Sequence, residues 1–261
     1  MDRPATHRAI ALVAAAVVCV SGCSWLTGPA PSGPEGSGGF TTGPATVAPP
    51  SGETRTPPPE TPVPGFGDWQ VINPQGVRIS VDSAGLVLDL IGPLLWFNEQ
   101  RGVLFYRIVT GDFRATATVR TWKASDPAAA PGGDGTIQLA GLMARTEVPA
   151  ENYVFIVSGS IGMSTGLETK TTTSSRSVYV QRGMPTGGDA ELRLCRVGPT
   201  FELSWRHVDS SEAWTLMSTF ERRDMPQTLQ VGANIYTDGV PDIVARFEDL
   251  AIEPLAPGKP C

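Results

Sequence analysis

The chain has 261 residues, of which 41% are hydrophobic and 18% are charged, and its formal net charge at pH 7 is −6. Lysine and arginine form no run anywhere, so neither a nucleic-acid partner nor a polybasic lipid-binding patch is expected. The region after position 65, about 190 residues, is long enough for one domain with a sizeable core. We therefore expect one globular domain, preceded by segments of a different composition.

The first 22 residues have the three-part layout of an export signal. A head with Arg3 and Arg8 is followed by an uncharged apolar stretch at 9–20 and by small residues directly before Cys23. This arrangement resembles a bacterial lipoprotein signal, which implies cleavage before Cys23 and acylation of that cysteine. A plain signal peptide or a single membrane anchor is the alternative, but the stretch is shorter than the roughly twenty residues of a spanning helix. The resemblance predicts an exported protein with a lipid anchor in the membrane. In a cell with two membranes it implies the outer one, because Ser24 is not an aspartate.

Residues 23–65 are expected to form a disordered linker. The segment 24–64 holds eleven of the 24 prolines of the chain, and Gly, Ser and Thr fill most of its other positions. Such a segment cannot bury enough apolar surface to fold. It predicts a tether between Cys23 and a folded domain at 66–257, with a short tail at 258–261.

The domain itself shows short segments of alternating apolar and polar residues, bounded by turn residues, and no amphipathic helix. Strands are expected at 76–82, 85–90, 113–120, 137–145, 153–158, 177–181, 192–197, 201–206, 229–236 and 243–252. A turn is expected at 82–85, and the Asp-Gly pair at 238–239 predicts a hairpin between the last two strands. About ten short strands without helical crossovers indicate an all-β, two-sheet antiparallel β-sandwich.

Several segments resemble bacterial concanavalin A-like lectin/glucanase domains of jelly-roll fold. The similar segments, in order, are 95–98, the Gly-Asp-Phe that ends 104–113, the Gly-Leu-x-x-Arg strand at 140–145 with its partner at 153–156, the segment 192–201 followed by Trp214, and the closing strands at 231–232 and 245–252. The resemblance covers nearly the whole domain. It implies a fold rather than an activity, because this jelly roll carries lectins, glycosidases and inert modules alike. The chain departs from the pattern at 208–214, where many relatives have Ser-x-Asp-Gly.

Two cysteines remain beyond Cys23, and they are expected to pair. Cys195 lies in a predicted strand and Cys261 follows a Pro/Gly tail. Disulfides persist outside the cytoplasm, and this one would close a loop of about 65 residues, worth at most about 4 kcal/mol in the chain-entropy model. Two free thiols too far apart to meet are the alternative.

Residues for catalysis are scarce, so the chain is not expected to be an enzyme. His207 is the only histidine after the signal segment, and no motif around it suggests a Ser-His-Asp triad. Glycosidases need two carboxylates across a cleft. Glu202 has no second carboxylate at alternate spacing, and the Glu-x-Asp-x-Glu strand of catalytic relatives is missing. One histidine and two paired cysteines also make a zinc site improbable.

Calcium is possible, since the loops 209–212 and 238–242 are rich in oxygen ligands. Neither loop follows the spaced ligand pattern of a known calcium loop, and turn formation explains both. We predict no metal and no other cofactor.

Binding of a glycan is better supported by residue types, because aromatic rings pack on sugar rings while amide and guanidinium groups bind hydroxyls. The candidates for this site are Trp96, Asn98, Tyr106, Arg145, Asn152, Trp214 and Tyr236, with Trp122 and Asn234 of the same type. Core packing is the alternative for each tryptophan, and a salt bridge to Glu147 or Asp112 is the alternative for Arg145. Gly141 and Met143 share a strand face with Arg145, and a glycine there would leave room for a ligand.

The sequence therefore predicts a membrane-anchored envelope lipoprotein that carries a non-catalytic, glycan-binding sandwich. The alternatives are a protein-interaction or structural module of the envelope and, third, a glycosidase. Solvent exposure separates the first two: Trp96, Tyr106 or Arg145 in a groove favours sugar binding, and their burial favours the interaction module.

Overall fold

The computed structural model describes residues 61–62, 67–96, 102–147, 151–174, 176–184, 187–256 and 259–261, all within one compact unit, Arg55–Cys261. The predicted signal peptide, the lipidation site Cys23, nearly all of the predicted linker and the candidate ligand residue Asn98 lie outside the described residues. Among the described residues, no helix is long and apolar enough to cross a membrane.

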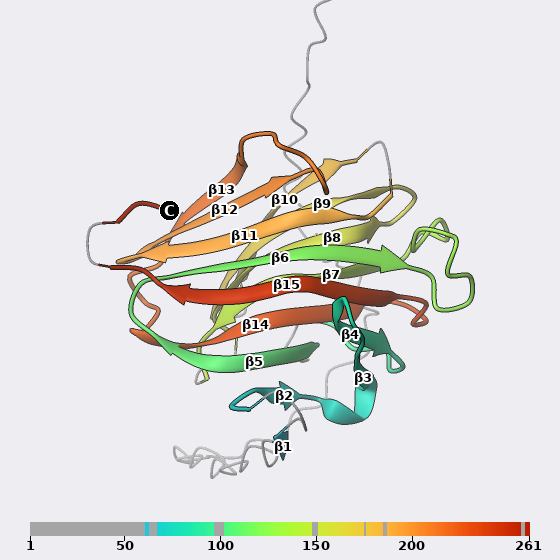
Figure 1. The fold of residues 1–261 in the computed structure, drawn as a ribbon, viewed down its shortest axis with the longest axis horizontal. Coiled ribbons are helices and arrows are strands. Elements are labelled where there is room, and N and C mark those ends of the chain that lie inside the picture. The colour runs from blue at the N-terminus through green and yellow to red at the C-terminus, as the bar shows by residue number, and fades with distance from the viewer. Residues whose placement is uncertain are drawn as a thin grey trace, which may run out of the picture. The chain divides into compact units, whose positions relative to one another are not determined.

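The domain is built from two antiparallel sheets that pack face to face (Figure 1). One sheet has the order β1 (Thr61–Pro62), β2 (Gln70–Ile72), β5 (Val103–Thr110), β14 (Thr228–Thr237), β7 (Ile137–Arg145), β8 (Tyr153–Ile161), β9 (Thr165–Thr173), β10 (Arg176–Gly183). The other has the order β13 (Thr215–Glu221), β12 (Thr200–Arg206), β11 (Ala190–Val197), β6 (Phe113–Trp122), β15 (Val244–Pro254), β4 (Gly85–Leu90), β3 (Val77–Val81). A 3-10 helix (Pro74–Gly76) precedes β3. The predicted fold class, a two-sheet antiparallel jelly roll, is confirmed.

The core lies between the sheets because each strand turns alternate residues toward the opposite sheet. In β6, Phe113, Ala115, Ala117 and Val119 are buried in this core, and the residues between them point outward. In β7, Ala140, Leu142 and Ala144 belong to the same core, whereas Leu139 and Met143 belong to the outer face of the eight-stranded sheet. Both sheets therefore have a core face and an outer face.

Five strands were not among the predicted ones: β1, β2, β5, β9 and β13. β9 has the sequence TGLETKTTT, which lacks the apolar alternation that marks a half-buried strand. It is nevertheless paired along its full length with β8 on one side and β10 on the other. Pairing with neighbours, rather than local pattern, places this segment in the sheet.

One predicted turn is confirmed and one predicted hairpin is wrong. Asp82 accepts hydrogen bonds from the backbone N–H groups of Ala84 (2.9 Å) and Gly85 (3.1 Å), and this turn joins β3 to β4. The Asp-Gly pair at 238–239 does not close a hairpin, because β14 and β15 lie in different sheets. The segment between β14 and β15 instead crosses from one sheet to the other. Within it, the Asp238 side chain accepts a hydrogen bond from the N–H of Ile137 (2.7 Å).

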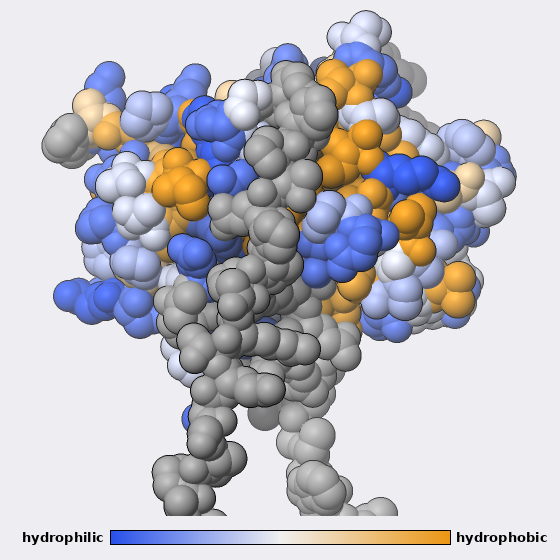
Figure 2. All heavy atoms as spheres, turned by 90° about the horizontal axis from the view of Figure 1, so that it is seen from below, coloured by the Kyte–Doolittle hydropathy of each residue, from blue (hydrophilic) through white to orange (hydrophobic). Residues whose placement is uncertain are grey.

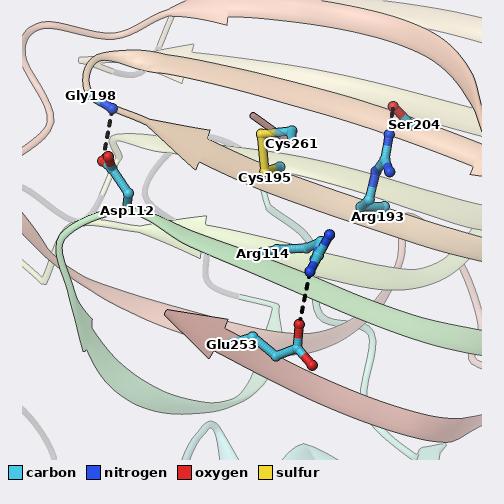
Figure 3. The surroundings of a disulfide bond; sticks show 8 residues. All are labelled: Asp112, Arg114, Arg193, Cys195, Gly198, Ser204, Glu253 and Cys261. Atoms are coloured by element: carbon cyan, nitrogen blue, oxygen red, sulfur yellow. Dashed lines mark hydrogen bonds and ion pairs between the residues drawn. A yellow bond between two sulfur atoms is a disulfide. The ribbon is translucent and has the colours of Figure 1, made fainter. Parts of the chain in front are cut away.

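The structure joins the two cysteines that the sequence analysis paired, with Cys195 and Cys261 bonded at a Cα–Cα distance of 5.9 Å (Figure 3). Cys195 is fully buried on the outer side of β11. An ion pair between Arg114 and Glu253 (3.1 Å) lies on the same sheet (Figure 3). The disulfide thus fixes the C-terminal tail to the seven-stranded sheet.

Exposed hydrophobic side chains occur around the domain, and Figure 2 shows patches of them between hydrophilic residues on one side of the molecule. The edge strand β10 is exposed along all eight residues. Its Val178, Tyr179 and Val180 are 64%, 48% and 45% exposed, respectively. This strand leaves one hydrogen-bonding edge of the eight-stranded sheet without a partner among the described strands.

Candidate functional site

Several predicted ligand residues meet on the outer face of the eight-stranded sheet. Here they belong to a second group of packed apolar side chains, separate from the core, which we call the aromatic cluster. Its members are Trp96, Leu104, Tyr106, Leu139, Met143, Tyr153, Phe155, Val157 and Tyr236. Trp96, Tyr106 and Tyr236, which the sequence analysis selected by residue type, thus lie in one cluster although they are far apart in the chain.

The rings of the aromatic cluster contact one another in a row. Ring centroids are 5.8 Å apart between Trp96 and Tyr153, 5.8 Å between Tyr153 and Phe155, and 5.6 Å between Phe155 and Tyr236. The Tyr153 hydroxyl donates a hydrogen bond to the backbone oxygen of Trp96 (2.9 Å). This hydrogen bond attaches the segment that carries Trp96 to β8. Burial raises the pKa of the Tyr153 hydroxyl to about 12.

Three charged side chains are packed against these rings. The Arg145 guanidinium lies 5.5 Å from the centre of the Trp96 ring, and the Lys170 ammonium lies 5.6 Å from that of Phe155. The Tyr236 hydroxyl donates to Glu168 (3.2 Å), which also accepts from the amide of Gln181 (2.8 Å). Burial raises the pKa of Glu168 and lowers that of Lys170, because it penalises the charged form of each.

The aromatic cluster is closed to solvent in this structure. Trp96 is 1%, Tyr106 0% and Arg145 1% exposed. Asn234 is fully buried on the same face, and both polar atoms of its amide have no hydrogen-bond partner within the described part of the chain. By the exposure criterion derived from the sequence, this face favours an interaction or structural module over a sugar groove.

Gly141 does not leave room for a ligand as the sequence analysis suggested. A Cβ at this position would lie 2.2 Å from the backbone oxygen of Ile156 and 2.9 Å from Cδ1 of Leu192. The glycine is therefore required by close contact with β8 and with the core. Met143, in contrast, does lie in the aromatic cluster, beside Arg145 on the same strand.

Two further candidates lie outside the aromatic cluster. Asn152 is buried in the turn before β8, where its side-chain oxygen accepts from the N–H of Ser174 (2.7 Å). Trp214 is half-buried on the other sheet, between the guanidinium groups of Arg193 and Arg206, each 4.7 Å from its ring centre. Both positions have structural explanations.

An open hollow of about 570 Å³ lies at one end of the seven-stranded sheet. We call it the β6 hollow. Ligand pockets commonly have volumes of about 300–1,000 Å³. It is lined by residues 120–122 at the end of β6, 127–130 in the next loop, 187–189 before β11, 207–208 after β12, and Arg246 of β15. The side chains with binding chemistry are Arg120, Trp122, Asp189, His207 and Arg246.

The position of these side chains follows from strand alternation. Arg120 and Trp122 continue the outward-facing set of β6, since Val119 points into the core. Arg246 is the direct neighbour of Arg120 on β15, and its guanidinium lies 5.4 Å from the centre of the Trp122 ring. The tryptophan and both arginines thus share one patch of the outer face.

Two loops complete the walls of the hollow. In the loop after β6, the backbone N–H of Lys123 donates to the backbone oxygen of Ala129, and the N–H of Ala129 donates to the backbone oxygen of Asp126, both at 2.9 Å. In the loop before β11, a Cβ at Gly188 would lie 2.3 Å from the Thr121 hydroxyl oxygen, so that only glycine fits this close approach. Asp189, next in the chain, accepts from the N–H of Thr121 (2.9 Å).

Other residues weighed for catalysis or metal binding have ordinary surroundings. His207 lies at the rim of the hollow with its ring edge-on to Trp205, 5.0 Å between centroids. Asp242 accepts from the N–H and hydroxyl of Ser125, both at 2.8 Å, and Asp209 lies 3.3 Å from Arg120. Within the described ranges, no three His, Cys, Asp or Glu side chains gather as metal ligands would.

Sequence reasoning missed most of the hollow. Trp122 was considered among the sugar-binding residue types, but Arg120, Asp189, His207 and Arg246 were not assigned to any site. The alternation of strand 113–120 already placed Arg120 on the outer face. Nothing in the sequence indicated that Asp189 and Arg246, from distant segments, would join it, because that depends on the strand order β11-β6-β15.

No family model matches the chain, and no curated protein matches it. Solved structures do share its fold. A functionally unknown protein from Saccharomyces cerevisiae superposes with a TM-score of 0.59 at 14% identity, covering 72% of this chain and 98% of that one. The GH43 protein BlXynB from Bacillus licheniformis superposes with a TM-score of 0.53 at 12% identity, covering 72% of this chain.

A third similar structure is the xylan beta-1,4-xylosidase from Bacillus halodurans, with a TM-score of 0.51 at 13% identity over 70% of this chain. This chain spans 37% of the length of each of these two Bacillus proteins. At such identities the similarity establishes the fold alone: the β-sandwich occurs both as a separate chain and as part of longer glycoside hydrolase proteins.

Proposed function

We propose that this chain is a membrane-tethered, non-catalytic glycan-binding protein and that its binding site is the β6 hollow. The observation that carries the proposal is the composition of the hollow. A tryptophan, two arginines and a carboxylate line an open space of about 570 Å³. A sugar needs an aromatic face for its apolar ring surface and fixed donors and acceptors for its hydroxyls.

Fixed geometry supports this choice of site over the aromatic cluster. Glu248 holds Arg120 through both of its oxygens at 3.0 Å, and Asp82 holds Arg246 at 2.6 Å. Side chains held in this way lose little further freedom when a ligand binds, so less of the binding free energy is spent on ordering. The aromatic cluster is closed, so a ligand there would first have to displace packed rings.

The structural comparisons support a role with glycans, since the Bacillus proteins that carry a similar sandwich are named as a GH43 protein and a xylan xylosidase. A non-catalytic role is proposed because Asp189 is the only carboxylate that lines the hollow among the described residues, and it is already bound to Thr121 and Arg120. A glycosidase needs a pair of carboxylates on either side of the scissile bond.

The tether is proposed from the sequence alone. Cys23 after the apolar segment is the expected acylation site, and the proline-rich segment that follows would hold the domain away from the lipid surface. The intact chain should incorporate a palmitate analogue and partition into detergent. The Cys23→Ala variant should keep its signal segment. Normal cleavage and release of that variant would contradict lipid anchoring.

The binding proposal is tested with the full-length chain in detergent on an array of envelope and plant-wall glycans. Trp122→Ala should weaken binding by at least about tenfold, because the ring loses its contact with the sugar. Tyr179→Ala removes an exposed aromatic ring on β10, far from the hollow in the strand order, and should bind like the parent. Thermal melts establish that both variants are folded. A parent chain that binds no glycan overturns the proposal.

A second candidate function, a protein-interaction module, is favoured by the burial of Trp96, Tyr106 and Arg145 and by the exposed edge strand β10. Edge strands with free backbone groups pair with extended segments of other proteins. A photo-crosslinker at position 179 should then capture one protein in intact cells, and Val180→Pro should abolish this crosslink. Glycan binding that requires Trp122 would favour the first candidate instead.

A further inference from the structure

We infer that the β6 hollow accepts saccharides without anionic groups and rejects those that carry a carboxylate, sulfate or phosphate. This inference rests on the proposed function, and it narrows the class of glycan. It is drawn from the charge balance around the two arginines that line the hollow.

Arg120 is surrounded by three carboxylates. Its Nε donates to Glu248 at 3.0 Å, its Nη2 lies 3.3 Å from Asp209, and its Nη1 lies 3.6 Å from Asp189. Hydrogen bonds to Glu248 and Asp209 raise the pKa of Arg120 even though burial opposes this. A single positive charge is therefore matched by three negative ones.

Arg246 is also paired. Its Nη2 lies 2.6 Å from Asp82, and the pKa of Asp82 is lowered, chiefly by a hydrogen bond from Ala84 and further by Arg246. The two guanidinium groups of the hollow thus share four carboxylates: those of Asp82, Asp189, Asp209 and Glu248. The local charge is negative although arginines line the surface.

The negative charge around the two arginines would repel an anionic ligand. To form a bidentate ion pair with a guanidinium, the ligand would have to displace a carboxylate that already binds it, and that carboxylate would remain close to the ligand. Like charges placed together oppose binding, and this effect is a common source of specificity. A hydroxyl group, in contrast, accepts from a remaining guanidinium N–H without displacing any partner.

The hollow also offers groups that suit hydroxyls. Asp189 is 38% exposed at its side chain and keeps acceptor capacity for a sugar hydroxyl. The Thr121 hydroxyl is not such a group, because Thr121 alternates with Arg120 and Trp122 along β6 and its side chain points toward the core. The guanidinium N–H groups that no carboxylate holds are the matching donors.

The test measures binding of two matched probes, xylohexaose as the neutral one and hexagalacturonate as the acidic one, to the full-length chain, followed by an array of neutral, amino and acidic glycans. We expect every glycan bound through Trp122 to lack anionic groups. The affinity of the chain for such a glycan should change less than about threefold between about 50 and 500 mM NaCl, since no net charge is neutralised on binding.

The second arm of the experiment removes part of the negative charge around the two arginines. The double variant Asp82→Asn and Asp209→Asn removes the carboxylate partner of Arg246 and one of the three carboxylates around Arg120, without removing the ring. It should gain affinity for acidic glycans by about tenfold or more and keep that for neutral ones within about threefold. The matched control is Asp89→Asn, which changes an ion pair with Arg78 outside the hollow and should alter neither affinity.

Each outcome is decisive. Neutral glycans bound through Trp122, together with the gain in the double variant, support the inference. Acidic glycans bound by the parent chain through Trp122 overturn it and leave the proposed function standing. Glycan binding that survives Trp122→Ala overturns it by moving the site elsewhere. A chain that binds no glycan at all overturns the proposed function and this inference with it.

Discussion

The two outer faces of the sandwich have the same backbone architecture but opposite surface chemistry. On the eight-stranded sheet, rings from three strands (β5, β8 and β14) and from the segment before β5 pack into the closed aromatic cluster, with Arg145, Glu168 and Lys170 against it. On the seven-stranded sheet, arginines and carboxylates pair at the surface around an open hollow. One face is closed by packed side chains, and the other has an open hollow at its surface.

The difference follows from the cost of burying polar groups. The first face excludes water, so its charged groups shift their pKa values and its contacts contribute to stability. The second face leaves its ion pairs in water, where each is worth about 0–1 kcal/mol. Its ion pairs orient side chains more than they stabilise the fold. Aromatic residues alone therefore do not identify a ligand face in this fold.

The largest expected effect comes from breaking the aromatic cluster. Phe155 is fully buried between Tyr153 and Tyr236, so Phe155→Ala should lower the free energy of unfolding by about 3–5 kcal/mol. Urea unfolding followed by tryptophan fluorescence measures this. Trp122→Ala on the opposite face should cost less than half as much. Equal costs for the two variants would show that the faces do not differ as described.

The disulfide gives the next largest effect, because it holds the tail on the seven-stranded sheet. The bond closes a separation of 66 residues, and the chain-entropy model gives it at most about 4 kcal/mol. Reduction should therefore lower the melting temperature, and Cys195→Ser with Cys261→Ser should reproduce the reduced value. Thiol alkylation before and after reduction follows the pairing. Free thiols in oxidised protein, or an unchanged melt on reduction, would contradict this role.

The smallest expected effect is a pH dependence of the free energy of unfolding, caused by Glu168 on the closed face. Burial raises the pKa of Glu168 above its ordinary value of 4.5, so the folded protein keeps a proton that the unfolded chain has lost. The free energy of unfolding should then fall as the pH rises from about 4.5 through the raised pKa, and stay level above it. Glu168→Gln should remove that decline in urea titrations at several pH values. Asp209→Asn, an exposed carboxylate, serves as the control.

The fold class was accessible from the sequence because alternation within strands is a local property. Strand 113–120 shows it clearly, and the structure bears it out as β6. β9 was missed because its threonines carry no alternation. The Asp-Gly pair at 238–239 was interpreted as a hairpin because turn chemistry is local, whereas the choice between pairing in one sheet and crossing to the other is made by the packing of both strands.

The site was less accessible for the same reason. Trp96, Tyr106 and Tyr236 could be selected by residue type, and the structure places them together. Their burial could not be predicted, because it depends on how the segment before β5 lies on the sheet. The β6 hollow joins Asp189, Arg120 and Arg246 across three neighbouring strands or their ends. No sequence pattern links residues that far apart.

The position of β15 has a consequence for how the chain folds. β15 lies between β6 and β4 in the seven-stranded sheet, and Figure 1 shows it, in red, beside the green β6. The hairpin of β3 and β4 joins that sheet only through β15, about 150 residues later in the chain. During synthesis the hairpin therefore waits for nearly the whole domain before it can pair. Contacts of such long range predict slow folding, with the last step set by the arrival of residues 244–254.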